Sequence, residues 1–548
     1  MDAWEELVTS ALLGTDRKPL AGSARSGDAA PVALLDAAAV HTVQRRAGLR
    51  PGPAAAPLEG APEDGRRPLP ERAGRRLGQL LAGRAAPAPS GGRRGAAPDL
   101  TELLPQWLAA AAEHGYGPPA AALPALLDAA RARTDLRPQA LAFAGPRGLW
   151  LARLNPEWKF ALRGAGGGGT LPDPGDPDAG PALWEEGLFA ERVALLSAVR
   201  AADPARGREL LASTWGSERA EDRLMFLDSL RAGLGPADEE FLESALSDRS
   251  RNVRATAAEL LSALPASALA ARMAERAASC VSLDRTEGAE TVVVEAPHEC
   301  DAGMRHDGVT PTPPTGRGER SWWLGQLVEA APLDCWPGRF GGRTPEEIVA
   351  LPVTDDWRVE LHAAWCRAAV RQRNADWSRA LLGSPAAPQA TGPGTSSLAE
   401  RAQLLATLPE EERAAWVASF IAAHGLSEAF QLLGVCAVPW SDPLGRAVVD
   451  ALDIARDAGS YPWSFSGVMG LAERCLSPAA APQLTALTAL PAEPEDASPG
   501  AAAYWSEAFQ RLVSTLELRA AMHAELAEAD RPEPAEADRR GTPGPRTA

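Results

Sequence analysis

The chain has 548 residues, of which 45% are hydrophobic and 23% are charged, and its formal net charge is −17. A chain of this length can hold roughly two to four packed units. The acidic balance argues against a general binder of nucleic acids or anionic membranes, because contacts with phosphates need a clustered basic surface.

The sequence carries no signal for a membrane segment or for a secreted, disulfide-bonded protein. No segment reaches the roughly 18 unbroken apolar residues of a transmembrane helix, and the opening MDAWEELVTSALLG has no basic stretch before its apolar residues. The six cysteines are scattered and form no CxxC pair. We therefore expect a cytoplasmic protein without a disulfide framework and without membrane association.

Residues 1–49 are predicted to form N-terminal helices, and residues 50–98 a flexible linker with one helix at 71–81. The linker is rich in Pro, Gly, Ala and Arg, a composition that is typical of mobile segments. Each of the first two helices has an apolar face. These faces consist of Trp4, Leu7, Val8, Ala11 and Leu12 in the first, and Leu35, Ala39 and Val43 in the second.

Residues 99–162 are predicted to be a helical segment, in which Thr101 caps the first helix and Gly145 and Pro146 break a later one. Residues 163–182 form a Gly/Pro loop. Its run RGAGGGGT suggests a phosphate-binding loop, but it lacks the GK[ST] ending and no strand precedes it. A flexible loop is therefore the better interpretation.

Residues 183–279 are predicted to be the helical core around which the chain is organised. Between Asp248 and Pro265 the apolar residues follow the spacing of one buried helix face. They are Val253, Ala257, Leu260, Leu261 and Leu264. A short polar link, SDRSR, precedes this helix, so we expect it to pack antiparallel to the helix before it.

This helix pair resembles a HEAT-type repeat, through Asp248 in the inter-helix turn and Arg254 early in the second helix. In such repeats an Asp and an Arg at these places often form a ladder between neighbours. A single helical pair cannot bury its apolar face alone, so stacked pairs are implied. Strict periodicity fails outside this region, and an irregular helical domain stays open as the alternative.

The remaining segments complete an all-α prediction: a stack of helical hairpins with a short HEAT-like solenoid core, a small β/loop insertion and Pro/Gly-rich linkers. The insertion carries the β-favouring stretch Thr291-Val292-Val293-Val294, from which we predict a strand within 290–297. The predicted segments are an insertion at 280–320, helices at 321–382, a linker at 383–397, C-terminal helices at 398–530 and a disordered tail at 531–548.

The strongest candidates for metal ligands are Cys280, His298, Cys300 and His306. Their residue types suit zinc, but their spacing fits no common zinc knuckle. We therefore regard the four as a weak candidate site and predict no metal and no cofactor.

No catalytic constellation is evident, and we expect a protein that is not an enzyme. There is no GxSxG elbow. His362 and Cys366 lie four residues apart on one helix, where Trp365 and Ala369 indicate a packed face and favour a structural pair. Acidic runs stand at helix starts, where the helix dipole explains them.

The tryptophans lie mostly at helical spacing or beside Pro, which favours core packing and loop anchoring. A partner-binding groove that a few of them line is the alternative. The residues concerned are Trp150, Trp158, Trp322, Trp323, Trp336, Trp365, Trp416, Trp440 and Trp463.

Four stretches together resemble a bacterial family of unknown function, number 5691 (DUF5691). They are WEELVTSALLGTDR, GPRGLWLARLNPEW, DRSRNVRATAAELLSALP and ERSWWLGQLVEAAPLDCW. The resemblance implies an α-helical scaffold that is encoded near a MoxR-type AAA ATPase, a von Willebrand A-domain protein and a SWIM zinc-finger protein. It implies no catalytic residues.

The leading functional hypothesis is a non-enzymatic helical scaffold or adaptor that binds other proteins. Two alternatives remain open. One is a metal-assisted enzyme with a site in the insertion at 280–320. The other is a HEAT-like nucleic-acid binder, which needs one basic strip from Arg251, Arg254, Arg272 and Arg276.

Overall fold

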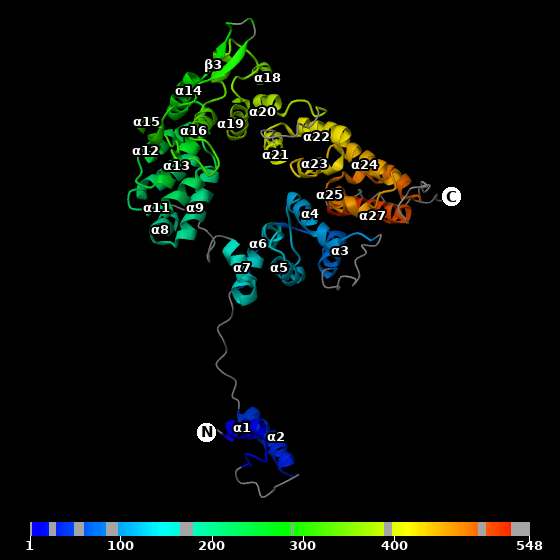
Figure 1. The fold of residues 1–548 in the computed structure, drawn as a ribbon. Coiled ribbons are helices and arrows are strands. Elements are labelled where there is room, and N and C mark those ends of the chain that lie inside the picture. Colours follow the sequence, from blue (N-terminus) through cyan, green and yellow to red (C-terminus); the bar gives the residue numbers. More distant parts are fainter. Residues whose placement is uncertain are drawn as a thin grey trace, which may run out of the picture. The chain divides into compact units, whose positions relative to one another are not determined.

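The computed structural model describes residues 3–20, 29–48, 60–83, 97–164, 179–286, 288, 290–387, 397–490 and 500–527. Within these residues it contains 27 α-helices and two small two-stranded sheets (Figure 1). The predicted all-α class with a small β insertion is confirmed. The chain divides into two compact units, Met1–Ala61 and Pro62–Ala548.

The first unit is a helical hairpin of α1 (Ala3–Leu13) and α2 (Ala30–Gly48). Leu7 is buried between the helices, and the Arg45 guanidinium lies 5.0 Å from the centre of the Trp4 ring. The predicted apolar face of α2 does not turn into this hairpin. Leu35 is 69% exposed and Val43 is 66% exposed.

The second unit begins with a cluster of helices and two short strands that pair in parallel. Its elements are β1 (Arg67–Pro68), α3 (Glu71–Ala82), α4 (Leu100–Glu113), β2 (Tyr116–Gly117), α5 (Leu123–Ala132), α6 (Arg137–Leu154) and α7 (Lys159–Gly164). The helix predicted at 71–81 is confirmed as α3. Leu77 and Leu80 of α3 are fully buried, so residues 62–82 pack into the body where composition predicted a linker.

The cap of α4 is Asp99, whose side chain accepts a hydrogen bond from the Thr101 backbone N–H; the prediction of Thr101 as the cap was wrong by two residues. Asp competes well at this position because a carboxylate also favours the positive end of the helix dipole. The predicted break at Gly145 is confirmed, since its backbone leaves the helical region within α6 with φ +59°.

Arg66 explains why a glycine occupies the break in α6. Its guanidinium donates hydrogen bonds to the carbonyl oxygens of Ala142 and Phe143, which the break leaves without helical partners. A Cβ on Gly145 would lie 2.2 Å from Nη2 of Arg66. Only glycine fits at this φ and this distance.

The predicted core is a run of short antiparallel helices. They are α8 (Ala179–Glu186), α9 (Phe189–Ala202), α10 (Pro204–Thr214), α11 (Ala220–Ser229), α12 (Glu239–Ala245), α13 (Arg251–Ser262) and α14 (Ala268–Cys280). The predicted buried face of α13 is confirmed, because Val253, Ala257 and Leu261 are fully buried.

The Asp–Arg ladder expected from the HEAT resemblance forms with a different arginine. The Asp248 carboxylate, in the turn between α12 and α13, lies 2.9 Å from Nε of Arg223 on α11. Arg254 instead donates to the backbone carbonyl oxygen of Asp248, at 2.7 Å. The turn is therefore bound to α11 by a side-chain pair and to the following helix α13 by the hydrogen bond from Arg254.

The insertion contains the strand predicted at 290–297. β3 (Val281–Asp284) and β4 (Thr291–Val294) form an antiparallel hairpin. The Val292 N–H donates to the carbonyl oxygen of Pro352, and its carbonyl oxygen accepts from the Thr354 N–H. Because of these bonds, the hairpin is anchored to the chain that follows it. Two further helices lie near it in sequence: α15 (Ala302–His306) and α16 (Glu319–Ala330).

The rest of the second unit continues the stack. Its helices are α17 (Cys335–Arg339), α18 (Pro345–Ala350), α19 (Arg358–Arg371), α20 (Ala375–Leu382), α21 (Leu398–Ala406), α22 (Glu410–His424), α23 (Leu426–Leu433), α24 (Asp442–Asp457), α25 (Ser466–Cys475), α26 (Ala481–Leu484) and α27 (Ala501–Ala527). Trp336, Trp365 and Trp377 are buried. The Trp365 ring contacts both of the others, with its centre 5.7 Å from that of Trp336 and 5.3 Å from that of Trp377. For Trp336 and Trp365 the predicted core role is confirmed, and Trp377 is a further buried tryptophan that the prediction did not include.

Helix α27 packs against the first helices of this unit, and Figure 1 shows it beside α3. Arg76 of α3 pairs with Glu525 at 2.6 Å, and the Tyr116 hydroxyl donates to the carbonyl oxygen of Leu526 at 2.9 Å. Met522 and Leu526 are buried in the same apolar cluster as α3 to α6. The second unit thus joins segments more than 400 residues apart.

Several predicted linkers lie largely outside the described residues. They are most of the loop at 163–182, including the glycine run; most of the linker at 383–397; and the tail at 531–548. Among the helices that are described, none has the length and apolar character needed to cross a membrane.

Candidate functional site

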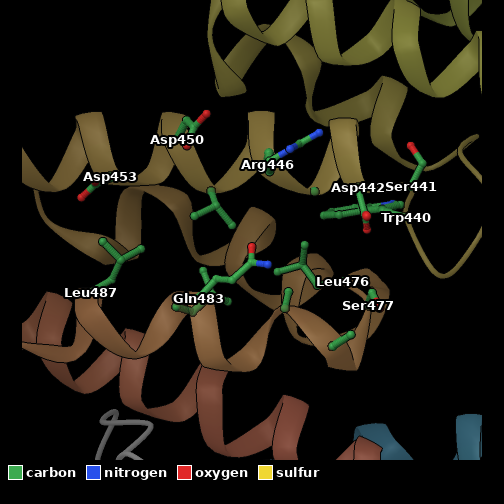
Figure 2. A pocket seen from close by; sticks show the side chains of 15 residues that line it. Trp440, Ser441, Asp442, Arg446, Asp450, Asp453, Leu476, Ser477, Gln483 and Leu487 are labelled. Atoms are coloured by element: carbon green, nitrogen blue, oxygen red, sulfur yellow. The ribbon is translucent and has the colours of Figure 1, made fainter.

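The candidate site is a groove between α24 and the segment 476–487, and we call it the α24 groove (Figure 2). Its volume is about 390 Å³. Its lining residues are Trp440, Ser441, Asp442, Gly445, Arg446, Val449, Asp450, Asp453, Leu476, Ser477, Ala479, Ala480, Gln483, Leu484 and Leu487.

Helix α24 supplies one wall because its residues divide into two faces. Leu444, Val448 and Leu452 are fully buried and hold the helix on the core. Polar residues of the groove recur on the next face, and both Asp442 and Asp450 are exposed. Apolar residues at i, i+4 and i+8 beside a polar stripe are the pattern of a helix that is half embedded.

The opposite wall is a winding segment of short helices, from Pro478–Ala480 through α26 to Thr485–Thr488. Leu476 and Leu484 are buried and form the apolar floor. In Figure 2 the side chains of Leu476, Gln483 and Leu487 lie between this segment and α24. The walls approach closely at Gly445, where an added Cβ would lie 3.0 Å from Cδ2 of Leu476.

Hydrogen bonds to backbone carbonyl oxygens join the two walls of the α24 groove at both ends. At one end the Trp440 N–H donates to the carbonyl oxygen of Cys475 at 2.7 Å. At the other end Arg456 donates to the carbonyl oxygen of Leu487 at 3.3 Å. These contacts fix the spacing of the walls, so the groove is a preformed feature of the fold.

The rim of the groove is acidic. Asp442 and Asp450 have no ion-pair partner within the described chain, and Asp453 is paired with Arg456 at 2.7 Å. Arg446 is the one cation among the lining residues, and it too has no carboxylate partner there. The rim therefore offers two free carboxylates against one free guanidinium, above an apolar floor.

Trp440 adds a hydrogen-bond donor at the closed end. The residue is 2% exposed, and its indole N–H is buried without a partner among the residues that the structure describes. A buried donor without a partner costs about 1–3 kcal/mol.

A second hollow, of about 750 Å³, lies near the other side of α25. Its aromatic residues include Trp463, which is 54% exposed, and Phe430, which is 43% exposed. Trp463 stacks on Tyr461 with ring centres 4.0 Å apart. Arg474 and Arg511 line the same hollow, but they pair with Glu102 and Glu473. Trp463 is the one tryptophan among the residues that line this hollow, so it is not the groove lined by several tryptophans that the sequence alternative describes.

The four candidate metal ligands are not brought together. Among the described residues, no three His, Cys, Asp or Glu side chains lie close enough to hold a metal ion. Cys280 is buried, and burial raises the pKa of its thiol. His298 is exposed and lies 3.9 Å from the Glu295 carboxylate.

His362 and Cys366 are both packed within α19. Burial, with a smaller contribution from Arg358, lowers the pKa of His362 to about 4, so its ring is neutral near pH 7. The ring packs on Trp365 with centres 5.6 Å apart. This setting suits a structural histidine better than a general base, whose pKa needs to lie near the working pH.

The arginines proposed as a basic strip are mostly engaged. Arg272 and Arg276 both bond to the buried carboxylate of Asp307, and together they hold its pKa low against the opposing effect of burial. Arg272 also contacts Glu243. Arg254 donates to the carbonyl oxygen of Asp248. Arg251 is exposed.

The sequence predicted α24 as a helix but did not single out its acidic residues. A signal was available, because Asp442, Arg446, Asp450 and Asp453 recur at helical spacing beside the buried face. The sequence of the opposite wall of the groove contains no such signal. Its short helices follow Pro478 and Pro482, and their distance from α24 depends on long-range packing.

The comparisons with known proteins give one match. A model of the family of unknown function DUF5691 matches residues 6–526, which is most of the chain. No curated protein matches the chain.

Proposed function

Because this chain belongs to the family of unknown function DUF5691, we propose that it is a non-enzymatic helical scaffold that binds another protein through the α24 groove. The proposed ligand is an amphipathic helix or short segment of that protein. Its apolar residues lie on Leu476 and Leu484, and its basic residues face Asp442 and Asp450. The preformed groove with two free carboxylates is the observation that carries this proposal.

The α24 groove, with a volume of about 390 Å³, can receive a few side chains of a helix that lies over it. Helix α24 has 16 residues and is therefore about 24 Å long, at about 1.5 Å per residue. A partner helix of about four turns could lie along it, which is the helix-in-groove mode of recognition. Apolar contacts would supply affinity, and the acidic rim would select a basic partner over an acidic one.

The family resemblance suggests where such a partner is to be sought. It points to a MoxR-type AAA ATPase and a von Willebrand A-domain protein encoded nearby. A scaffold that presents one chain to an ATPase needs a groove and no catalytic residues. The proposal therefore includes these two proteins as the first partners to test.

The test compares two variants with the same change in charge. In the first, Asp442→Asn and Asp450→Asn remove the free carboxylates of the groove. In the control, Glu410→Gln and Glu411→Gln remove two exposed carboxylates at the start of α22. A fluorescent 16-residue Leu/Lys helix is titrated with each protein at two salt concentrations, and a Leu/Glu helix serves as the second probe.

The expected result is a loss of at least tenfold in affinity for the Leu/Lys helix in the groove variant alone. Equal losses in both variants would show that net charge, not the groove, attracts the peptide. Co-purification with the ATPase or the von Willebrand A-domain protein, reduced by the groove variant, would support the partner assignment.

A further inference from the structure

Aromatic rings line the second hollow, which has a volume of about 750 Å³. Trp463 is 54% exposed although its ring contacts Tyr461 and Tyr504, with centres 4.0 and 5.2 Å away. Phe430 of α23 is 43% exposed and lies against α25, where a Cβ on Gly467 would come within 2.9 Å of its ring. The hollow therefore presents two aromatic surfaces that a ligand can reach, and exposed rings that gather in one place mark a binding site more readily than scattered ones.

Among the described residues that line this hollow, three are charged, and two of these are arginines with carboxylate partners. Arg511 lies 2.7 Å from the Glu473 carboxylate, and Arg474 lies 3.4 Å from the Glu102 carboxylate. Both partners come from outside the lining of the hollow. The arginines are therefore compensated, and neither offers an unopposed charge to an anionic ligand.

The third charged residue, Glu507 of α27, is half-buried and has no partner for its carboxylate among the described residues. Arg511 is one turn further along α27, at the i+4 position from which an arginine can pair with a glutamate. Its guanidinium contacts Glu473 instead. Because a half-buried charge without a partner is unfavourable, a cation bound in the hollow would compensate Glu507.

We propose that the second hollow binds the guanidinium group of an arginine side chain in a peptide segment of another protein. Glu507 accepts hydrogen bonds from the guanidinium, whose planar fork of N–H groups matches a carboxylate. Trp463 supplies the aromatic ring for a cation–π contact. The rings of Trp463 and Tyr504 meet at 65°, and Glu507 follows Tyr504 by three residues, which places its carboxylate on the same face of α27.

The charges of the hollow favour a peptide over the free amino acid. Free arginine carries an α-carboxylate, which would need a cation of its own in the site. Arg474 and Arg511 are both engaged with carboxylates, so a peptide backbone without that charge fits better. The hollow shares no lining residue with the α24 groove, and this inference does not depend on the proposed function.

The experiment titrates the full chain into N-acetyl-arginine methylamide and measures binding by ligand-observed NMR. The control probe is N-acetyl-citrulline methylamide, which has nearly the same shape without the charge and should bind at least about tenfold more weakly. Glu507→Gln should weaken binding of the arginine probe to the same extent. Glu517→Gln removes an exposed carboxylate of the same helix outside the hollow, and it should leave the affinity unchanged. Trp463→Ala should weaken the arginine probe by roughly two- to fivefold.

Equal binding of the arginine and citrulline probes by the natural protein would overturn the proposal, and so would equal effects of Glu507→Gln and Glu517→Gln. Adenosine monophosphate tests the opposite charge, and tighter binding of this probe than of the arginine probe would overturn the assignment to a cation. Free L-arginine that binds more tightly than the blocked probe would overturn the assignment to a peptide. Asp442→Asn with Asp450→Asn should leave binding of the arginine probe unchanged, which separates a failure here from a failure of the α24 groove.

Discussion

Arg200 and Asp238 form a two-pronged ion pair in the core of the second unit, with Nη1 and Nη2 of the arginine 2.9 and 3.1 Å from the two carboxylate oxygens. The Arg200 side chain is 0% exposed and the Asp238 side chain 3%. The remaining donors of Arg200 reach the carbonyl oxygens of Pro204, Leu230 and Ala232. One guanidinium thus joins helix α9 to the turns around it.

Removing one partner of this pair should be costly. We expect Asp238→Ala to lower the free energy of unfolding by about 3–5 kcal/mol, because it leaves a buried cation uncompensated. Urea unfolding followed by circular dichroism measures the loss. The control is Asp228→Ala, which breaks an exposed pair with Arg231 and should cost at most about 1 kcal/mol. Similar losses in both variants would contradict the structural role given to Arg200.

A glycine beside Arg200 gives a second prediction. A Cβ on Gly207 of α10 would lie 2.5 Å from Cδ of Arg200, whereas Gly78 of α3 has nothing within 4 Å. Gly207→Ala should therefore destabilise the protein by about 1–3 kcal/mol through overpacking. Gly78→Ala should stabilise it by about 0.5–1 kcal/mol, because alanine is the better helix former. Thermal melts of the two variants should shift in opposite directions.

Removal of the hydroxyl oxygen of Tyr116 should weaken the contact between Tyr116 and α27. Tyr116→Phe removes the hydrogen bond to the carbonyl oxygen of Leu526 without creating a cavity. We expect a loss of about 1–2 kcal/mol, since the carbonyl oxygen loses a buried donor. Hydrogen exchange should quicken in the last turns of α27 and stay unchanged in α13. Unchanged exchange near Leu526 would argue that the hydrogen bond does not hold α27 in place.

The buried His362 predicts a dependence of stability on pH. Its folded-state pKa of about 4 lies below the ordinary histidine pKa of 6.5, so between these two values the unfolded chain is protonated at His362 and the folded chain is not. The contribution of His362 is fully present above pH 6.5 and is lost as the pH falls towards 4. The loss is at most about 3.5 kcal/mol, at roughly 1.4 kcal/mol per pKa unit. His362→Gln should flatten the difference in unfolding free energy between pH 7 and pH 5.

For the candidate metal ligands at the insertion, we predict that no zinc is bound. Since the described side chains do not converge there, the dialysed protein should contain less than about 0.1 zinc per chain by elemental analysis. His298→Ala should change the unfolding free energy by less than about 0.5 kcal/mol, because the side chain is exposed. Stoichiometric zinc that is lost in this variant would favour the metal-assisted enzyme instead.

The helices could be predicted from sequence wherever an apolar face and an end signal coincide. The stretch from Ser250 to Ser262 shows both, and α13 occurs there. Which side chains pair with one another could not be predicted in the same way. Asp248 pairs with Arg223 and not with Arg254, because the distance between helices decides which arginine reaches it. The same holds for the linker predicted around α3, because the buried residues of α3 pack against α27, a helix more than 400 residues later in the chain.

The candidate site was only half visible in the sequence. The polar stripe of α24 can be read from spacing alone, but the groove exists because Trp440 and Arg456 bond to carbonyl oxygens of a later segment. Helix α2 shows the opposite limit. The spacing of Leu35, Ala39 and Val43 predicted that they share one helix face, but it did not show that this face turns away from α1.

The packing of α27 on α3 and α4 has a consequence for synthesis. Arg76 leaves the ribosome 449 residues before Glu525. At about 5–20 residues per second, this is a delay of roughly twenty to ninety seconds. Throughout it, the apolar patch that later receives Met522 and Leu526 stays open to other nascent chains. Chaperones that bind early in translation should therefore associate with the first helices of the second unit until translation ends.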